Sequence, residues 1–233
     1  MSNSEDNADG QTPGGCNPLA SSDDTLFAAL ARHNIALPPE QVAQLDHYCR
    51  VLWDWNEKLN LTRHTDYEKF VGRDVVDTLR LADALAPNEK VLDVGTGGGV
   101  PGIVLAIVRP DLNVSLCESV AKKAKAVDEI VKQLGLRVPV HHARAEELLV
   151  HSRFDSLVMR AVAPLAKLLT WFEPVWVSFS RLLVIKGPAW VEERREAREK
   201  NLMRSLQLRK LATWPLPGTH SESVLLEIRP TED

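Results

Sequence analysis

The sequence predicts an α/β protein of Rossmann-like fold, with a doubly wound, mostly parallel sheet and a helical N-terminal extension. After Pro87, short β-rich runs alternate with amphipathic helical stretches, and this alternation implies right-handed crossovers between parallel strands. The first run leads into five glycines within residues 95–102, which is typical of a turn that approaches a nucleotide-like ligand. In such sheets ligands lie at the carboxyl ends of the strands, so the residues that follow each run are the functional candidates.

Three segments of the chain differ in composition. Residues 1–22 are rich in Ser, Asn, Asp, Gly and Pro and bury too little apolar surface to offset their ordering entropy, which predicts a disordered tail. Residues 23–86 carry apolar side chains at helical spacing, and Pro38 and Pro39 suit the start of a second helix. Residues 87–233 form the predicted Rossmann-like domain. Its strands are expected at residues 90–94, 113–118, 137–142, 153–160, 181–187 and 223–228, and its helices at residues 100–108, 120–135, 165–172 and 191–205.

Composition restricts the class of protein. The net charge is −4, but the first 24 residues hold five of the 32 acids, which leaves 27 acidic and 28 basic residues in the remainder. Because the charge of this remainder is balanced, we expect no tight non-specific binding to the phosphates of nucleic acids. A local basic face can still dock on a structured RNA. No window of about 18 uncharged apolar residues exists to cross a bilayer, and the N-terminus does not resemble a secretory signal. We therefore expect a cytoplasmic protein with no membrane role.

The three cysteines, Cys16, Cys49 and Cys117, have no C-x-x-C spacing, which favours free thiols over a disulfide framework or a thiolate metal site. His141 and His142 are neighbours on a strand and therefore point to opposite faces. We expect no metal.

The glycine tract can be read in two frames. Gly97, Gly99 and Gly102 match the dinucleotide pattern G-x-G-x-x-G, whereas Gly95, Gly97 and Gly99 match G-x-G-x-G, which is commoner in methyl-donor sites. The strand ends at residues 93–94, so the frame that begins at Gly95 lies next to it. This favours S-adenosylmethionine over NAD, with Asp93 as a candidate acceptor for the ammonium group of the methyl donor, and it leaves Gly102 inside the following helix.

The next two strand ends offer further cofactor contacts. Glu118 lies about twenty residues past the glycines, where a carboxylate accepts hydrogen bonds from both ribose hydroxyls. At the third strand end, Ala145 and Glu146 are candidates for reading the adenine edge, and the alternative is that Glu146 belongs to the polar first turn of a short helix.

Cations follow the fourth and fifth strands. Arg160 is expected to face the transferred methyl group and its acceptor, where a planar guanidinium matches guanine O6 and N7 or a phosphate. Lys186 is the second cation on the same edge and, with Arg160, a candidate for substrate binding. The alternatives are a structural ion pair for Arg160 and a snorkelling side chain for Lys186.

Several motifs are absent from the sequence. There is no G-x-S-x-G elbow, no Walker lysine and no deaminase zinc pattern. The tetrapeptides NPPY and DPPY, which mark methyltransferases acting on exocyclic amines, are absent as well. Nucleophilic, phosphoryl-transfer and deamination chemistry therefore lack support.

Five segments resemble one known family, the 16S ribosomal RNA guanine-N7 methyltransferase G family, RsmG, also called glucose-inhibited division protein B. They are "WNEKLNLTR" (55–63), "VLDVGTGGGVPGIVLAIVRPD" (91–111), "RAEEL" (144–148), "FDSLVMRAVAPL" (154–165) and "VIKG" (184–187). The resemblance covers nearly the whole chain after the first twenty or so residues.

The resemblance implies an S-adenosylmethionine-dependent methyltransferase that acts on one guanine of the small-subunit RNA. If the cofactor contacts of the family are carried over by position, the corresponding residues of this chain are Gly95, Val100, Glu118, Ser119, Ala145, Glu146 and Arg160. Two departures are visible. The family pattern R-H-x-x-D-S-L reads "RDVVDTL" here, with Asp74 for the histidine and Thr78 for the serine, and the pattern K-K-x-x-F-L reads "KKAKAV".

The expected chemistry is in-line displacement at the sulfonium methyl by guanine N7. Because N7 has a free lone pair and loses no proton, no general base is required, and catalysis is mainly positioning. The expected partner is 16S rRNA or the small ribosomal subunit, bound by a monomer. The rival functions are an NAD-dependent oxidoreductase, a catalytically silent RNA-binding module and a methyltransferase of small molecules.

Overall fold

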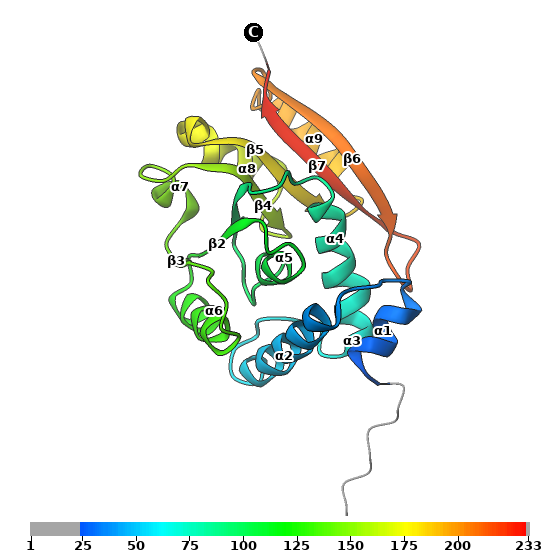
Figure 1. The fold of residues 1–233 in the computed structure, drawn as a ribbon. Coiled ribbons are helices and arrows are strands. Elements are labelled where there is room, and N and C mark those ends of the chain that lie inside the picture. The colour runs from blue at the N-terminus through cyan, green and yellow to red at the C-terminus, as the bar shows by residue number, and fades with distance from the viewer. Residues whose placement is uncertain (1–23, 232–233) are drawn as a thin grey trace, which may run out of the picture.

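A computed structural model describes residues 24–231, so the predicted tail of residues 1–22 lies outside the described part of the chain. The predicted fold class is confirmed: seven strands form one mostly parallel sheet in the order β3-β2-β1-β4-β5-β7-β6 (Figure 1). The strands are β1 (Lys90–Val94), β2 (Asn113–Glu118), β3 (Val140–His142), β4 (Phe154–Arg160), β5 (Phe179–Lys186), β6 (Leu206–Pro215) and β7 (Glu222–Pro230).

The first five strands are parallel, and β7 pairs with both β5 and β6 in the antiparallel direction. The carboxyl ends of β1 to β5 consequently meet at one edge of the sheet. The strand order runs outward from β1 in both directions, and this switch point is where ligands bind in open α/β sheets.

Helices cover both faces of this sheet (Figure 1). The second N-terminal helix starts where the sequence suggests, because Pro39 is the first residue of α2. Before α1, the Thr25 hydroxyl accepts the Ala28 N–H. The helices are α1 (Leu26–Arg32), α2 (Pro39–Asn56), α3 (Tyr67–Lys69), the π-helical η1 (Phe70–Val75), α4 (Val76–Ala82), α5 (Gly102–Val108), α6 (Ala121–Gln133), α7 (Ala145–Leu148), α8 (Leu165–Phe172), the 3₁₀ segment η2 (Glu173–Ser178) and α9 (Trp190–Glu199).

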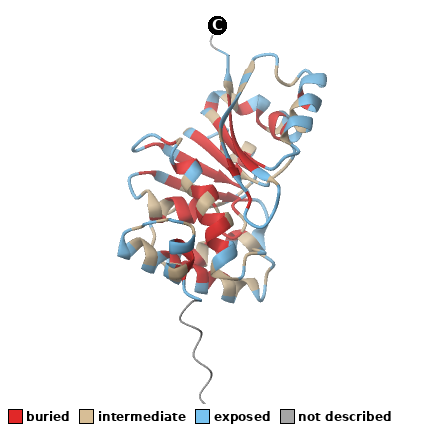
Figure 2. Ribbon diagram, turned by 90° about the vertical axis from the view of Figure 1, so that its right-hand side faces the viewer, coloured by how far each residue is buried: buried red, intermediate tan, exposed pale blue. Residues whose placement is uncertain are grey.

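Two apolar cores flank the sheet, because alternate residues of each strand point to opposite faces. On β1, Val91 belongs to the core that contains α1, α2, α4, α5 and α6, while Leu92 belongs to the core that contains α7, α8 and α9. The central strands are therefore buried from both sides (Figure 2).

The N-terminal extension shares the first of these cores. Tyr48 of α2 is fully buried, packs edge-on against Phe70 at 5.9 Å between ring centroids, and donates its hydroxyl to the Gly98 carbonyl at 3.0 Å. Burial, with a smaller contribution from Asp74, raises the pKa of Tyr48 well above its ordinary value, so the phenol stays a donor. The boundary that we expect near residue 87 thus joins two segments with a common core, and their division into domains stays a prediction.

The C-terminal part differs from the expectation. The charged helix ends at Glu199 instead of Ser205, because the chain turns at Asn201, whose φ of 59° is left-handed. The following strand β6 was not predicted. It is the outer strand of the sheet and most of its side chains are exposed or half-buried, so its sequence lacks a clear apolar alternation.

A buried ion-pair network ties the segment before β1 to the sheet. The Arg181 guanidinium contacts Glu89 at 3.0 Å and Glu227 at 3.1 Å, and it also donates to the Ala84 carbonyl at 2.8 Å. Both carboxylates are buried. The network joins the end of the extension to β5 and β7.

We predict that Arg181→Ala lowers the free energy of unfolding by about 3 kcal/mol, because it leaves Glu89 buried without a countercharge. The matched control is Arg195→Ala, which removes an exposed pair with Glu192 and is expected to cost at most about 1 kcal/mol. Urea unfolding of both variants checks this, and equal losses would contradict the assignment.

Candidate active site

The glycine tract forms the loop that closes the carboxyl end of β1. Gly95, Gly97 and Gly99 have φ values of +68°, +59° and +110°, a region that side chains rarely adopt. The frame that begins at Gly95 therefore describes the loop. Gly102 lies in α5, where a Cβ would come within 2.1 Å of Leu116 Cδ2, so the lack of a side chain lets helix and sheet pack closely.

Glu118, the last residue of β2, fastens this loop. Its carboxylate accepts the Gly97 N–H at 3.1 Å through Oε2 and the Val120 N–H at 2.8 Å through Oε1. The residue is buried, and the next one, Ser119, is exposed. Two carboxylate oxygens have about four lone-pair positions, so acceptor capacity remains for a ligand.

Asp93 lies beneath the loop and is buried. Its Oδ2 accepts the Thr96 hydroxyl at 2.6 Å and the Gly102 N–H at 2.9 Å, while its buried Oδ1 has no hydrogen-bond partner among the described residues. Burial outweighs both hydrogen bonds and raises the pKa of Asp93 to about 6. One oxygen thus shapes the loop and the other remains an unused acceptor.

The segment after α2 forms a second wall. Asn56 Oδ1 accepts the backbone N–H groups of Leu61 and Thr62, and Trp53 Nε1 donates to the His64 carbonyl at 2.8 Å. Leu61 lies against Gly98 of the glycine loop. The extension therefore reaches the carboxyl edge of the sheet and is held there by its own polar side chains.

Arg160, the last residue of β4, is held by two carboxylates. Its Nη1 lies 2.6 Å from Asp74 Oδ1 and 3.4 Å from Asp77 Oδ2. Asp77 also accepts the Trp214 indole N–H at 2.9 Å, and burial raises its pKa although Arg160 opposes the shift. The ion-pair alternative raised from the sequence is therefore present in the structure.

Arg160 also lines a cavity of about 770 Å³ at the ends of β4 and β5. The walls include His64, the loop of residues 161–164 and Lys186. Val162 of that loop lies against Gly95, within 3.0 Å of the position that a Cβ would take there. The cavity thus borders the glycine loop, and the side chain of Val162 lies against both.

Lys186 is more enclosed than a snorkelling lysine. It is buried, and its Nζ donates to the Ala163 carbonyl at 2.6 Å and pairs with Glu193 at 2.7 Å. The ammonium group therefore fixes the loop of residues 161–164 against α9. Its contact with a substrate stays a prediction.

Ala145 and Glu146 open α7 after β3. Ala145 is buried, whereas the Glu146 carboxylate pairs with Arg144 at 2.6 Å. This is the polar first turn that the sequence offered as the alternative, and it leaves the adenine contact of these residues a prediction.

Three residues of the site were not identified from the sequence: Tyr48, His64 and Asp77. Asp77 had a usable signal, because it lies three residues after Asp74 in a helical segment rich in apolar residues, so that the two acids share one face and need a cation if that face is buried. Tyr48 and His64 act through contacts with segments distant in sequence, and no local pattern marks them.

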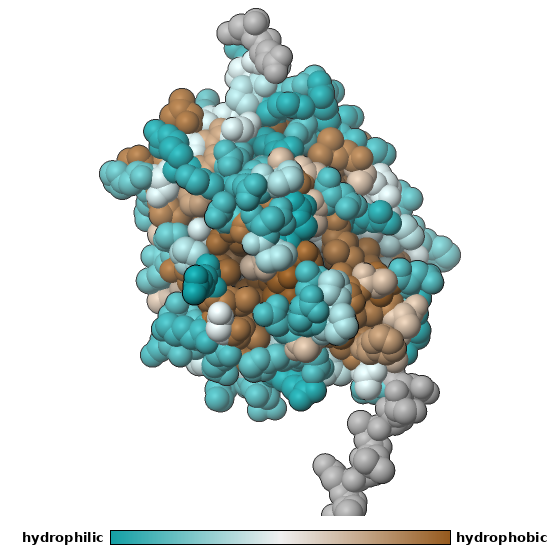
Figure 3. Space-filling view, viewed as in Figure 1, coloured by the Kyte–Doolittle hydropathy of each residue, from teal (hydrophilic) through white to brown (hydrophobic). Residues whose placement is uncertain are grey.

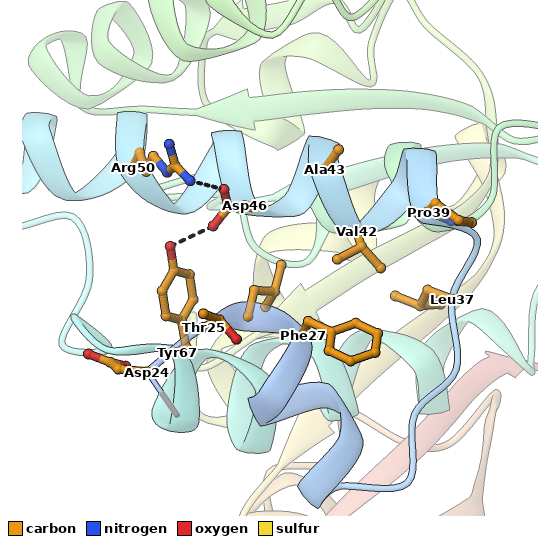
Figure 4. A pocket seen from close by; sticks show the side chains of 11 residues that line it. Asp24, Thr25, Phe27, Leu37, Pro39, Val42, Ala43, Asp46, Arg50 and Tyr67 are labelled. Atoms are coloured by element: carbon orange, nitrogen blue, oxygen red, sulfur yellow. Dashed lines mark hydrogen bonds and ion pairs between the residues drawn. The ribbon is translucent and has the colours of Figure 1, made fainter. Parts of the chain in front are cut away.

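A second cavity, of about 740 Å³, lies between α1 and α2 (Figure 4). Among residues 24–231, its walls come from residues 24–67 alone, with Phe27, Leu37 and Val42 on the apolar side and the hydrogen-bonded Asp46 and Tyr67 on the polar side. Apolar side chains also gather over this part of the surface (Figure 3). No strand end contributes to it.

Within residues 24–231, no group of three or more His, Cys, Asp and Glu side chains is placed to hold a metal ion. Cys49 and Cys117 are free and buried, and burial raises the pKa of the Cys117 thiol to about 12. Cys16 lies outside the described residues. None of the described helices is long and apolar enough to cross a membrane.

Residues 41–217 match the family model described as rRNA small subunit methyltransferase G. The chain belongs to this family. A ribosomal RNA small subunit methyltransferase G of Rhodopirellula baltica is 50% identical over 83% of this chain and 84% of its own length. The enzyme of the same name from Clostridium novyi is 34% identical over 73% of each chain. Membership makes this protein a methyltransferase of small-subunit rRNA.

Solved structures show the same fold. Magnesium protoporphyrin IX methyltransferase of Synechocystis, with bound S-adenosylmethionine, has a TM-score of 0.52 at 14% identity over 84% of this chain and 99% of that chain. TrmK of M. capricolum, in complex with S-adenosylhomocysteine, has a TM-score of 0.53 at 12% identity over 67% and 68%. This family member therefore has the fold of S-adenosylmethionine-dependent methyltransferases.

The raised pKa of Asp93 gives a testable pH dependence. Between about pH 4 and pH 6 the folded state holds this proton more tightly than the unfolded chain, so the contribution of Asp93 to stability declines as the pH rises through that range. We predict that Asp93→Asn, whose amide oxygen can accept the same two hydrogen bonds, gains about 2 kcal/mol relative to wild type between pH 4 and pH 7. Urea unfolding at both pH values measures the difference, and a pH-independent difference would contradict this account.

Proposed function

We propose that this protein transfers a methyl group from S-adenosylmethionine to N7 of one guanine in 16S rRNA. The observation that carries the proposal is the contact between Gly95 and Val162. It places the glycine loop, with Glu118 at its side, next to the cavity that Arg160 lines. A methyl donor on the loop and a base in the cavity would then be neighbours.

The residues present fit the methyl donor. Glu118 retains acceptor capacity for ribose hydroxyls, and the unpartnered Oδ1 of Asp93 suits an ammonium group. Gly95, Gly97 and Gly99 keep side chains away from the ligand, and when bound the cofactor supplies an electrophilic methyl group. Further cofactor contacts are proposed for Val100, Ser119, Ala145, Glu146 and Arg160.

The chemistry requires no acid or base from the protein. N7 of guanine carries a free lone pair, so the new N–C bond forms as the C–S bond breaks, the C–S electron pair goes to sulfur, and no proton moves. The positive charge passes from the sulfonium to the purine. What the protein supplies is position, with the base held about 3 Å from the methyl carbon.

Arg160 is suited to position the target guanine, which becomes cationic when it is methylated. A bare guanidinium would repel 7-methylguanine, but Asp74 and Asp77 offset its charge while leaving it on the cavity wall. Its remaining N–H groups are donors for O6 or a phosphate. Lys186 is proposed as a second substrate contact, through the loop that it holds.

The test is transfer of labelled methyl groups to naked 16S RNA, to protein-bearing small subunits and to a pool of metabolites. We expect label in the RNA, as 7-methylguanosine at a single position after digestion and mass spectrometry. Label in another nucleoside, or only in small molecules, would contradict the proposal. Whether naked RNA or the assembled subunit accepts the methyl group is read from the same experiment.

Titration calorimetry provides the control for the cofactor. S-adenosylmethionine is expected to bind more tightly than NADH. Tighter binding of NADH would favour the oxidoreductase alternative, and binding of neither would favour a silent RNA-binding module.

A further inference from the structure

His64 is held on the wall of the cavity at both its backbone and its ring. Its backbone N–H donates to Thr62 Oγ1 at 3.0 Å, and its carbonyl accepts the Trp53 indole N–H at 2.8 Å. Its ring Nδ1 lies 2.8 Å from Asp74 Oδ1. The side chain is 22% exposed and lines the same cavity as Arg160. Three polar contacts thus fix the position of His64 on the cavity wall.

Asp74 fixes the orientation and the tautomer of this ring. Its carboxylate is only 1% exposed and accepts at Oδ1 from Arg160 as well. A carboxylate oxygen that accepts the Nδ1–H hydrogen bond fixes the tautomer in which Nδ1 carries the proton and Nε2 carries the lone pair. Within residues 24–231, Nε2 has no hydrogen-bond partner. The cavity therefore contains an oriented acceptor beside a guanidinium donor.

Guanine is complementary to this pair. Its O6 and N7 are acceptors on one edge, while its N1–H and N2–H₂ groups are donors on the Watson–Crick edge. Adenine has a lone pair at N1 in place of that proton and would face the lone pair of Nε2. As N7 acquires the methyl group, the purine becomes cationic and its N1–H becomes a stronger donor. A hydrogen bond to Nε2 would then strengthen in the transition state, which is where it accelerates the reaction.

We infer that His64 contacts the target base, accepting a hydrogen bond at Nε2 from the Watson–Crick edge of the guanine, and that Asp74 is its positioning residue. The inference rests on the proposed function, because it names how the same cavity selects guanine. His64, a residue of the extension, would thus contact the substrate. Asp74 would have two roles: it orients His64 and it pairs with Arg160.

The first test compares His64→Phe, which keeps a ring and removes both nitrogens, with the control His47→Phe at an exposed position of α2. Single-turnover methylation of small subunits is measured at saturating S-adenosylmethionine. We expect the rate constant of His64→Phe to fall at least tenfold, with cofactor affinity within twofold of wild type and an unchanged melting temperature. The control is expected to match wild type. An unchanged rate, or a parallel loss of cofactor affinity, would overturn the inference.

The second test changes the base. Semisynthetic 16S RNA carries 1-methylguanosine, which lacks N1–H, or inosine, which lacks the exocyclic amine, at the target position. One of the two modified bases is expected to lower the methylation rate of wild type at least tenfold. The same base is expected to lower the rate of His64→Phe no further, because this variant already lacks the contact. Losses that multiply would overturn the role of His64. Failure of wild type to methylate unmodified RNA would contradict the proposed function instead, so the two failures are distinguishable.

Discussion

One guanidinium, that of Arg160, holds two buried carboxylates at the carboxyl end of β4, and the rest of the site depends on this ion pair. Asp74 and Asp77 come from η1 and α4 of the N-terminal extension, and Trp214 of β6 is hydrogen-bonded to Asp77. Two uncompensated carboxylates in the interior would cost several kcal/mol. Charge compensation thus joins the extension, the central sheet and its outer strand around Arg160, which also lines the cavity.

The glycine loop next to this cavity is held from three directions. Glu118 binds it from β2, Asp93 accepts the Thr96 hydroxyl from beneath, and the Tyr48 hydroxyl donates to it from α2. Such fixation suits the proposed reaction, in which the barrier is lowered by orientation and the protein moves no proton. The extension is therefore a structural part of the site: it supplies the buried Tyr48, which donates to the Gly98 carbonyl of the loop, and it supplies His64 to the wall of the cavity.

The parts of the site that follow a strand could be predicted from the sequence, because the carboxyl ends of parallel strands converge at one edge. This applies to the glycine loop, Glu118 and Arg160. The spacing of Asp74 and Asp77 indicates a need for a cation, but the pairing with Arg160 could not be predicted, since the two acids lie more than eighty residues earlier and only the folded chain brings them to β4. The strand β6 escaped prediction for a different reason: an exposed outer strand does not need the apolar alternation by which strands are identified. The enclosure of Lys186 depends on Glu193 of α9, which is equally invisible in a local pattern.

A crystal structure with S-adenosylhomocysteine tests the central claim most directly, namely that cofactor and substrate meet between the glycine loop and the cavity of Arg160. We predict that the ribose hydroxyls are hydrogen-bonded to Glu118 and that the sulfur faces the cavity lined by Arg160 and His64. A ligand bound in the cavity between α1 and α2, or one whose sulfur points away from Arg160, would contradict it.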